Sequence, residues 1–172
     1  ALHESGLGPA LRWLASRMAQ RNQFEVKVHT DDSTAISNEE IRFLLFECVR
    51  ELLFNSMKHS GASGAEVQLS REHDGLIAVR VCDRGNGFDL DVLDKRDAED
   101  ATFGLFSIQE RIQYIGGQMI IETAPGAGTA VTLTAPIGDI QTDREATAGE
   151  EQHGPESPGR MDETALHRVL VV

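Results

Sequence analysis

The sequence lacks the features that mark membrane, secreted and nucleic-acid-binding proteins. No apolar stretch approaches the roughly 18 residues that span a bilayer, and residues 1–8 lack the basic start and apolar stretch of a signal peptide. Basic residues are few, since 16 Lys and Arg stand against 28 Asp and Glu, for a net charge of −12. Because Lys and Arg neutralise the phosphates of a nucleic-acid backbone, we expect no nucleic-acid partner. We also expect no direct contact with a membrane.

Cysteine is also scarce. The two cysteines, Cys48 and Cys82, lack the spacing of a metal site and fall in predicted core elements. We therefore expect both to be free buried thiols, and the protein to be cytoplasmic. The chain begins without Met and ends on an apolar stretch, so we expect it to be a fragment of a longer protein.

Apolar spacing divides most of the chain into helices and strands. Helical spacing begins at Gly8-Pro9, with Leu11, Trp13, Leu14 and Met18 as apolar positions, and returns over residues 37–60 and 104–115. Strand spacing appears at residues 24–28, 67–69, 77–82, 119–121 and 131–133. This order predicts an α+β fold, with helices on one face of a mixed, largely antiparallel sheet.

The helix over residues 37–60 carries the clearest signals for its ends. Ser37 and Glu40 match a capping box, Ile36 and Ile41 match a hydrophobic staple, and Gly61 ends the helix. Residues 88–103, which are rich in acidic side chains, are predicted to form a loop. Residues 138–163 are rich in Gly, Pro, Thr and acidic side chains, which is typical of a flexible linker.

Polar side chains on the 37–60 helix form the first candidate site. The spacing of Glu51, Asn55, Lys58 and His59 places them along one side of the helix. Asn55 falls within the apolar stripe, where an amide costs stability unless it is bonded. A carboxylate one turn from an amide oxygen suits Mg²⁺ and a water, and the two cations could donate to phosphate oxygens. A solvated polar flank with two cations at the helix end explains the same pattern equally well.

The second candidate is the segment Asp83-Arg84-Gly85-Asn86-Gly87, which follows the 77–82 strand. Its glycines let the backbone turn sharply and approach a ligand closely. Asp83 can accept a hydrogen bond from an exocyclic amine such as that of adenine. Taken alone, this segment is better explained as an ordinary Asp/Gly turn.

The third candidate is Phe103-Gly104-Leu105, predicted to start the last helix. The free N–H groups and positive dipole end of a helix start make an anion site. The alternative is a glycine that only opens the helix.

The order and spacing of the three clusters resemble the N, G1 and G2 boxes of the GHKL ATPase superfamily, which includes gyrase-type, Hsp90-like, MutL-like and histidine-kinase ATPases. Residues 51–60 (ELLFNSMKHS) resemble the N box, residues 83–88 (DRGNGF) the G1 box and residues 104–111 (GLFSIQER) the G2 box. Residues 128–131 (GTAV) resemble the closing strand. The short loop between G1 and G2 and the Lys-His pair are similar to those of the NarX/NreB-type histidine kinases. The resemblance covers about residues 7–137.

This resemblance implies the Bergerat (GHKL) fold, a two-layer α/β sandwich, with ATP and Mg²⁺ as ligands. It implies that Asn55 coordinates Mg²⁺ and that Glu51 holds the ion's water or acts as a base. Lys58 and His59 would lie near the phosphates.

The resemblance also implies an adenine pocket. Asp83 would bind the adenine amine, with Thr129 supporting it through a water. Gly85 and Gly87 would shape this pocket. The segment Phe103-Gly104-Leu105 would meet the phosphates, with residues 88–103 as a mobile lid.

The family's phospho-accepting histidine lies on an upstream dimerisation helix, and no match for it exists here, since His3 lacks that setting. We therefore expect ATP binding without autophosphorylation, and as partners the missing dimerisation domain and a downstream response regulator. The expected domains are residues 1–20 as the end of a connecting segment and first helix, 7–137 as the catalytic domain, 138–163 as the linker and 164–172 as the first strand of a receiver domain.

Three other functions fit parts of the pattern. One is an anti-sigma-factor-type serine kinase, and another is a non-enzymatic nucleotide-binding interaction module. The third is a gyrase-type or MutL-like ATPase, against which the short lid and the small domain argue.

Overall fold

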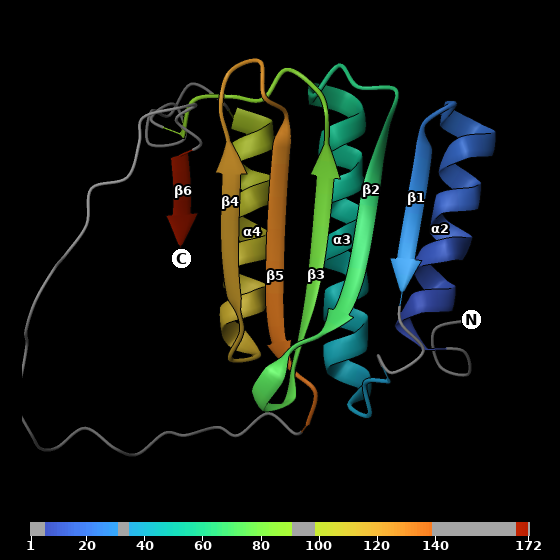
Figure 1. Cartoon of the computed structure of the whole chain (residues 1–172), viewed down its shortest axis with the longest axis vertical. Helices are drawn as coiled ribbons and strands as arrows, with labels where there is room; N and C mark the ends of the chain where they lie inside the picture. Colours follow the sequence, from blue (N-terminus) through green and yellow to red (C-terminus); the bar gives the residue numbers. More distant parts are fainter. Residues whose placement is uncertain (1–5, 31–34, 91–98, 139–167, 172) are drawn as a thin grey trace, which may run out of the picture.

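A computed structural model of the chain describes residues 6–30, 35–90, 99–138 and 168–171 (Figure 1). The elements in chain order are α2 (Leu7–Asn22), β1 (Glu25–Thr30), α3 (Glu39–His59), β2 (Gly64–Arg71), the 3₁₀ turn η1 (His73–Gly75), β3 (Leu76–Asp83), α4 (Glu99–Tyr114), β4 (Gln118–Thr123), β5 (Thr129–Pro136) and β6 (Arg168–Val171). Within this part of the chain, no helix combines the length and apolar character needed to cross a membrane.

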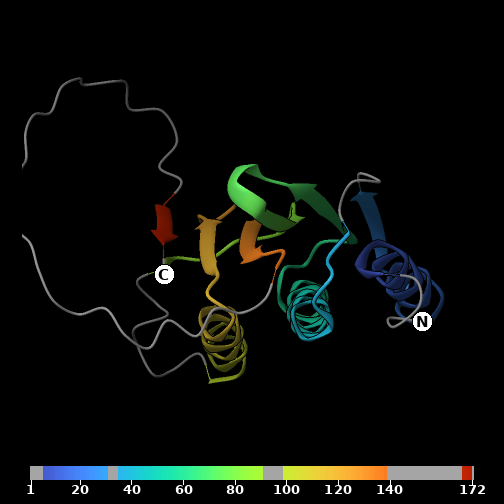
Figure 2. The same cartoon turned by 90° about the horizontal axis from the view of Figure 1, so that it is seen from below.

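The strands form one six-stranded sheet in the order β1-β2-β3-β5-β4-β6. Among the described strands, β1 and β2 pair in parallel and the other pairs are antiparallel. The three helices lie together on one face of the sheet, as the view from below shows (Figure 2). The predicted α+β architecture, with helices covering one face of a largely antiparallel sheet, is therefore confirmed.

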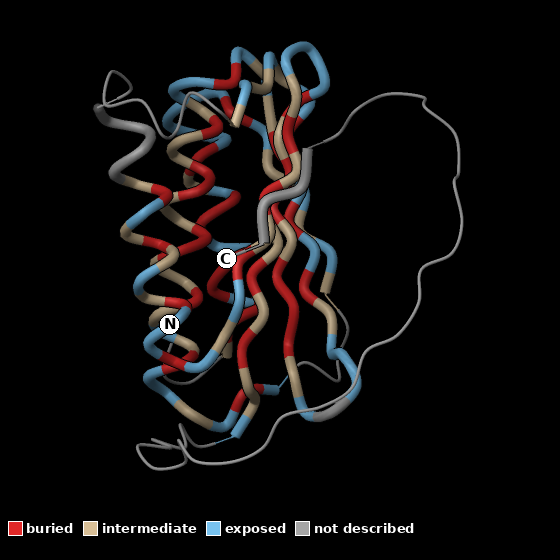
Figure 3. The backbone as a smooth tube through the Cα atoms, turned by 90° about the vertical axis from the view of Figure 1, so that its left-hand side faces the viewer, coloured by how far each residue is buried: buried red, intermediate tan, exposed pale blue. Residues whose placement is uncertain are grey.

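The core lies between the helices and the sheet face that they cover. Alternate residues of the central strands point into it, so that Val67, Val79 and Leu133 are fully buried on three neighbouring strands. Leu45 and Val49 of α3 are equally buried and belong to the same cluster. Figure 3 shows the buried positions concentrated where the helices and the sheet meet. This apolar contact fixes α3 and α4 beside the strand ends that carry the candidate site.

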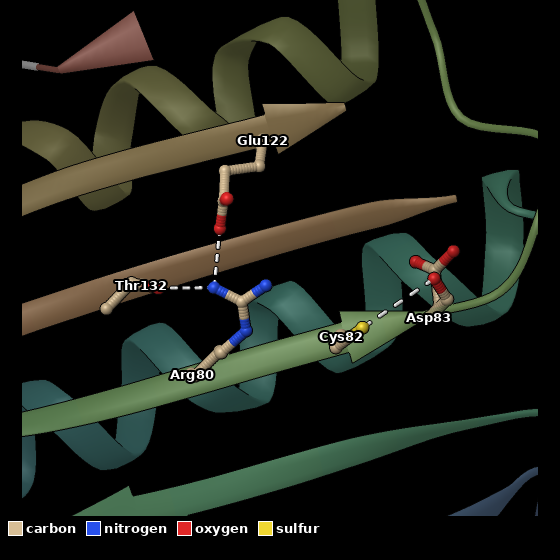
Figure 4. Close-up of polar contacts among 5 residues, drawn as sticks. All are labelled: Arg80, Cys82, Asp83, Glu122 and Thr132. Carbon is tan, nitrogen blue, oxygen red and sulfur yellow. Dashed lines mark hydrogen bonds and ion pairs between the residues drawn. The ribbon is translucent and has the colours of Figure 1, made fainter. Parts of the chain in front are cut away.

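The opposite face of the sheet is polar. Arg80 of β3 donates hydrogen bonds to Glu122 of β4 and to Thr132 of β5, which lies between them (Figure 4). The Arg80–Glu122 ion pair is partly exposed, so it adds at most about 1 kcal/mol to stability. Alternation of apolar inner and polar outer residues is typical of an antiparallel sheet covered on one side.

The start of α3 differs from the prediction by one residue. The N-cap is Asn38, whose Oδ1 accepts from the N–H groups of Glu40 at 2.9 Å and Ile41 at 3.1 Å. Ser37 is exposed and makes no cap, so the predicted Ser37–Glu40 capping box is wrong. Asn and Ser are both good caps and are neighbours here, and only the backbone path decides which of them reaches the free N–H groups.

The start of α4 also differs, and this affects a candidate site. The helix begins at Glu99, so Gly104 lies in its second turn. The four free N–H groups of a helix belong to its first turn. The prediction that a helix starts at Gly104 is therefore wrong, and so is the predicted loop where it covers residues 99–103. That Phe103-Gly104-Leu105 meets the phosphates stays a prediction.

Two side chains are more exposed than predicted. The spacing predicts Trp13 as an apolar position of the first helix, yet it is 51% exposed and lies under the guanidinium of Arg17. Cys48 is a buried free thiol as expected, whereas Cys82 is a free thiol only partly buried on the polar sheet face. Each error comes from one residue placed on the wrong side of a correctly predicted element.

Several predictions concern residues outside the described part of the chain. They are the turn at residues 31–33, the central part of the proposed lid (residues 91–98), His3, and the linker apart from Gly138. The predicted strand near the end of the chain is present as β6, which pairs antiparallel with β4. Its assignment to a receiver domain stays a prediction.

Candidate functional site

The first and third clusters meet between α3 and α4. A side chain at Gly104 would begin 2.9 Å from Asn55 Nδ2 and 3.2 Å from Glu51 Oε1. Glu51 and Asn55 lie one turn apart on α3, so both present polar atoms to the same short stretch of α4. The absence of a side chain at Gly104 therefore lets α4 lie directly against a carboxylate and an amide of α3.

The amide of Asn55 has the character of a ligand-binding group. Its Nδ2 atom is buried and has no hydrogen-bond partner among the described residues. A buried donor without a partner costs about 1–3 kcal/mol, which is tolerated where a ligand completes the bonding. This orphaned amide, next to the Glu51 carboxylate, is the observation that favours a bound polar group at this place.

The donor set fits Mg²⁺ bound together with phosphates. Magnesium is usually held by one or two protein oxygens, with waters and substrate phosphates completing its octahedron. Glu51 and Asn55 supply a carboxylate and an amide oxygen of this kind. No group of three or more His, Cys, Asp and Glu side chains suited to a metal occurs in the described ranges. The pair Glu51 and Asn55 suits an ion that arrives with a phosphate ligand and its own waters.

The carboxylate of Asp83 is held in a fixed orientation at the end of β3. Its Oδ2 accepts from the hydroxyl of Ser56 at 2.8 Å, and its Oδ1 accepts from the N–H of Gly85 at 2.9 Å. The residue is only 8% exposed. Each carboxylate oxygen can accept more than one hydrogen bond, so Asp83 keeps acceptor capacity for a ligand.

The glycines after Asp83 allow close contact between backbone segments. A side chain at Gly85 would begin 2.2 Å from the carbonyl oxygen of Ser60, at the end of α3. A side chain at Gly87, whose φ is +58°, would begin 2.0 Å from the carbonyl oxygen of Ala124. Both glycines thus lie against the protein's own backbone, and their expected approach to a ligand stays a prediction. The segment is thereby locked between α3 and the β4–β5 turn.

These features surround one pocket between α3, α4 and the ends of β3 and β5. Its volume is about 90 Å³. This is smaller than the roughly 300–1,000 Å³ of typical ligand pockets, so it suits one ring of a larger ligand. The lining residues are Leu52, Asn55, Ser56, His59, Ser60, Val81, Asp83, Gly87, Phe88, Leu105, Thr129 and Val131.

The predicted site residues reach this pocket to different degrees. Asn55, His59, Asp83, Gly87, Leu105 and Thr129 line it. Glu51 and Gly104 lie beside Asn55, and Gly85 donates to Asp83. Lys58 is exposed and is not among the lining residues. Phe103 belongs to α4, and its side chain lies outside the described part.

Two residues that contact this site were missed in the sequence. Ser56 donates to Asp83, and Thr123, which is 1% exposed, bonds to Thr129. Each had a signal, because Ser56 falls at a buried position of its helix and Thr123 continues the buried alternation of Met119 and Ile121. A polar residue at a buried position needs a hydrogen-bond partner, and that requirement could have singled out both.

A larger hollow of about 300 Å³ lies on the polar side of the sheet, beside β1, β2 and the end of β3. Its lining includes exposed side chains of both signs, among them Lys27, Glu66 and Arg84. Exposed charges of mixed sign keep their hydration and offer no buried polar group to a ligand. Asp83 lines both hollows, whereas the orphaned amide of Asn55 lines the smaller pocket and not the larger one, so the smaller pocket is the better candidate.

Comparison with known proteins shows which family the chain resembles. Residues 40–139, more than half of the chain, match the family described as histidine kinase-, DNA gyrase B- and HSP90-like ATPases. The oxygen sensor histidine kinase NreB of Staphylococcus carnosus is 33% identical over 141 residues, which are 81% of this chain and 39% of that protein. The sensor histidine kinase NarS of Mycobacterium tuberculosis is 35% identical over 136 residues, which are 79% of this chain and 31% of that protein.

A solved structure shows the same fold. The blue-light activated histidine kinase of Erythrobacter litoralis matches with a TM-score of 0.63 and 22% identity, over 76% of this chain and 42% of that one. This chain thus spans between about a third and two fifths of the two curated relatives. It belongs to the family of histidine kinase-, DNA gyrase B- and HSP90-like ATPases, whose members bind ATP.

Proposed function

We propose that this chain is the ATP-binding catalytic domain of a sensor histidine kinase, which transfers the γ-phosphoryl group of ATP to a histidine on a separate dimerisation domain. The observation that carries the proposal is the fixed, buried carboxylate of Asp83 at one end of a pocket whose other side holds the orphaned amide of Asn55. The two curated relatives described above are both named sensor histidine kinases. Their names favour this function over a serine kinase or an interaction module.

The base of ATP would lie at the Asp83 end. Asp83 would accept a hydrogen bond from the exocyclic amine of adenine, because both of its oxygens are held in place with lone pairs to spare. Thr129 faces Asp83 across the β3–β5 pair and would support the same edge of the base. Val81, Leu105 and Val131 would contact the ring, since they line the same pocket.

The phosphates would extend toward Gly104. Asn55 and Glu51 would hold Mg²⁺, which offsets negative charge on the phosphates. His59 lines the pocket, and Lys58, beside it at the end of α3, could reach the phosphates from the surface. Gly104 would leave room for these groups, and Phe103 would lie next to them.

The chemistry that such a site supports is in-line phosphoryl transfer. The accepting imidazole nitrogen bonds to the γ-phosphorus while the bond from that phosphorus to the β–γ bridging oxygen breaks, and ADP leaves. This chain's residues contribute positioning and charge, and Glu51 would hold a water or accept a proton. The dimerisation domain and a response regulator that receives the phosphoryl group are the proposed partners.

The first test is thermal melting with ATP, with and without Mg²⁺. A ligand that binds only the folded state stabilises it by about 2.7 kcal/mol at a hundredfold excess over its Kd, so the melting temperature of the wild type should rise. Asp83→Asn should abolish the rise, because an amide presents a donor where the amine also donates. Asn55→Ala should remove its dependence on Mg²⁺. Glu110→Gln, at an exposed position of α4, is the charge-matched control. A folded wild type that does not respond to saturating ATP would exclude the proposal.

The second test concerns phosphorylation. Incubation of this chain with γ-labelled ATP should leave no stable phosphate on it, since no residue here matches the family's accepting histidine. Addition of the parent protein's dimerisation domain should produce an acid-labile, base-stable label on that domain. A stable label on the present chain alone would contradict this assignment.

A further inference from the structure

Three polar residues form a row across the inner face of the sheet, at the base end of the pocket. Asp83 of β3 lies opposite Thr129 of β5, and Thr129 lies opposite Thr123 of β4. Asp83 and Thr129 line the pocket, whereas Thr123 lies behind Thr129 and is 1% exposed. Thr123 is thus placed to act on the ligand only through its neighbour.

The hydroxyl of Thr123 has four polar neighbours. Its Oγ1 lies 3.1 Å from the N of Phe88, 3.0 Å from the O of Gly128, 3.2 Å from Thr129 Oγ1 and 3.5 Å from the O of Phe88. A threonine hydroxyl has one proton and two acceptor lone pairs. These four neighbours therefore compete for the three hydrogen bonds that the hydroxyl of Thr123 can make.

The chemistry of the neighbours decides which group donates. The N–H of Phe88 can only donate, so it occupies one lone pair of Thr123. The carbonyl oxygen of Gly128 can only accept, and it is the nearer of the two carbonyls, so it receives the Thr123 proton. The hydroxyl of Thr129 can do either, and the place left for it is the second lone pair of Thr123. Thr129 must therefore donate its own proton to Thr123.

The direction of the hydrogen bond from Thr129 to Thr123 determines which polar groups the pocket offers to a ligand. Because the Thr129 proton is committed, Thr129 offers only lone pairs to a ligand. Asp83 likewise offers only lone pairs, since both oxygens already accept from Ser56 and Gly85. Two acceptors side by side favour a base edge that donates and disfavour one that presents a carbonyl oxygen.

We infer that Thr123 is a positioning residue that fixes Thr129 as a hydrogen-bond acceptor and thereby strengthens selection of a base with an exocyclic amine over one with a carbonyl. The inference rests on the proposed nucleotide site. A valine at position 123 keeps the shape and removes the hydroxyl. It frees the Thr129 proton, which can then turn toward a carbonyl oxygen in the pocket.

The test compares the dissociation constants of ATP and inosine triphosphate, which carries a carbonyl oxygen in place of the amine, by calorimetry with Mg²⁺. Wild type should prefer ATP. Thr123→Val should lower this preference by about three- to tenfold, as expected for one hydrogen bond, and Thr123→Ser should restore it. A loss of affinity that is equal for both nucleotides, with an unchanged ratio, would mean a purely structural role and would overturn the inference.

Two further variants keep the test decisive if Thr123→Val does not fold. Thr123→Ala removes the same hydroxyl with less crowding and should lower the ratio similarly. Thr129→Val removes the reading group itself and should also lower the ratio, and an unchanged ratio in either variant overturns the inference. Failure of folded wild type to bind ATP would overturn the proposed function as well, whereas ATP binding with no preference over inosine triphosphate would overturn the inference alone.

Discussion

At the scale of single residues, the site depends on polar groups that are fixed before any ligand binds. Asp83 has each oxygen held by a separate donor, one from α3 and one from its own loop. Asn55 has the opposite character, since its Nδ2 atom is buried with no partner among the described residues. A fixed acceptor suits recognition of a base, and an amide with unused capacity suits an incoming ion and its phosphates.

The two thiols give a prediction at the same scale. Burial raises the pKa of Cys48 to about 11, and burial also raises the pKa of Cys82. The thiolate is the reactive form, and Cys48 is fully buried whereas Cys82 is partly exposed. At pH 9, iodoacetamide should therefore modify Cys82 faster than Cys48 in the folded protein, as peptide mass mapping can measure.

The matched control is the same reaction in denaturant, where the two rates of modification should converge.

The raised pKa of Cys48 also determines how pH affects the stability of the folded protein. The unfolded chain ionises Cys48 near its model-peptide value of 9.0, and the folded chain does so only near 11. The Cys48 contribution to stability is therefore complete below pH 9 and is lost as the pH rises from 9 to 11. Faster modification of Cys48 than of Cys82 in the native protein would contradict this placement.

At the scale of elements, the start of α3 can be tested with neighbouring residues. Asn38 accepts from two free N–H groups, whereas Ser37 makes no cap. Asn38→Ala should lower the free energy of unfolding by about 1 kcal/mol, measured by urea denaturation. Ser37→Ala is the matched control and should change it by less than about 0.5 kcal/mol. The reverse order would restore Ser37 as the cap.

Helix α4 offers a substitution whose effects on stability and on binding should differ. Gly104 lies inside α4, where an alanine is favoured over glycine by about 0.5–1 kcal/mol. Its Cβ would meet Asn55 Nδ2 at 2.9 Å and displace the amide. Gly104→Ala should therefore leave stability nearly unchanged while weakening Mg²⁺-ATP binding at least about tenfold, which corresponds to 1.4 kcal/mol.

Calorimetry and chemical denaturation measure these two effects separately. Ser107→Ala, further along α4, is the control and should leave binding unchanged. Equal ATP affinity in Gly104→Ala and wild type would show that this part of α4 does not border the phosphates.

At the scale of the whole molecule, three distant segments converge at one end of the sheet. A Cβ at Gly87 would meet the carbonyl oxygens of Ala124 and Gly128, a Cβ at Gly85 would meet that of Ser60, and a Cβ at Gly128 would meet that of Asp83. Backbone hydrogen bonds join the same segments: Asn86 N donates to Ser60 O, and Gly126 N donates to Asn86 O. The segment after β3 is thus held by the end of α3 on one side and by the β4–β5 turn on the other.

Two glycines of this region provide a matched pair. Gly87 and Gly126 both have positive φ, which costs a side chain about 1–2 kcal/mol. Open space surrounds Gly126, whereas a Cβ at Gly87 would meet backbone at 2.0 Å. Gly126→Ala should lower the free energy of unfolding only by the cost of a positive φ. Gly87→Ala should lower it by more than about 4 kcal/mol or prevent folding. Equal melting temperatures for the two variants would contradict this convergence.

Local patterns along the chain were enough to predict the class of fold and most residues of the candidate site. Periodicity is a local property, so the three helices, the strand alternation and the common side of Glu51 and Asn55 on α3 followed from spacing along the chain. The position of Asp83 at a strand end was equally local. The predicted starts of α3 and α4 were wrong. Ser37 and Asn38 are both good caps, and the sequence alone does not show whether a glycine opens a helix or lies inside it.

Which of these groups meet depends on how the helices and strands pack together. The row of Asp83, Thr129 and Thr123 depends on the register of three strands, and the contact of Gly104 with Asn55 depends on how α4 packs on α3. Such pairings join residues far apart in sequence, and they are fixed by burial of a shared core and by the competition of buried polar groups for partners. No local pattern records these pairings. The spacing along the chain marks Ser56 and Thr123 as polar residues at buried positions, but it does not show that their partners are Asp83 and Thr129.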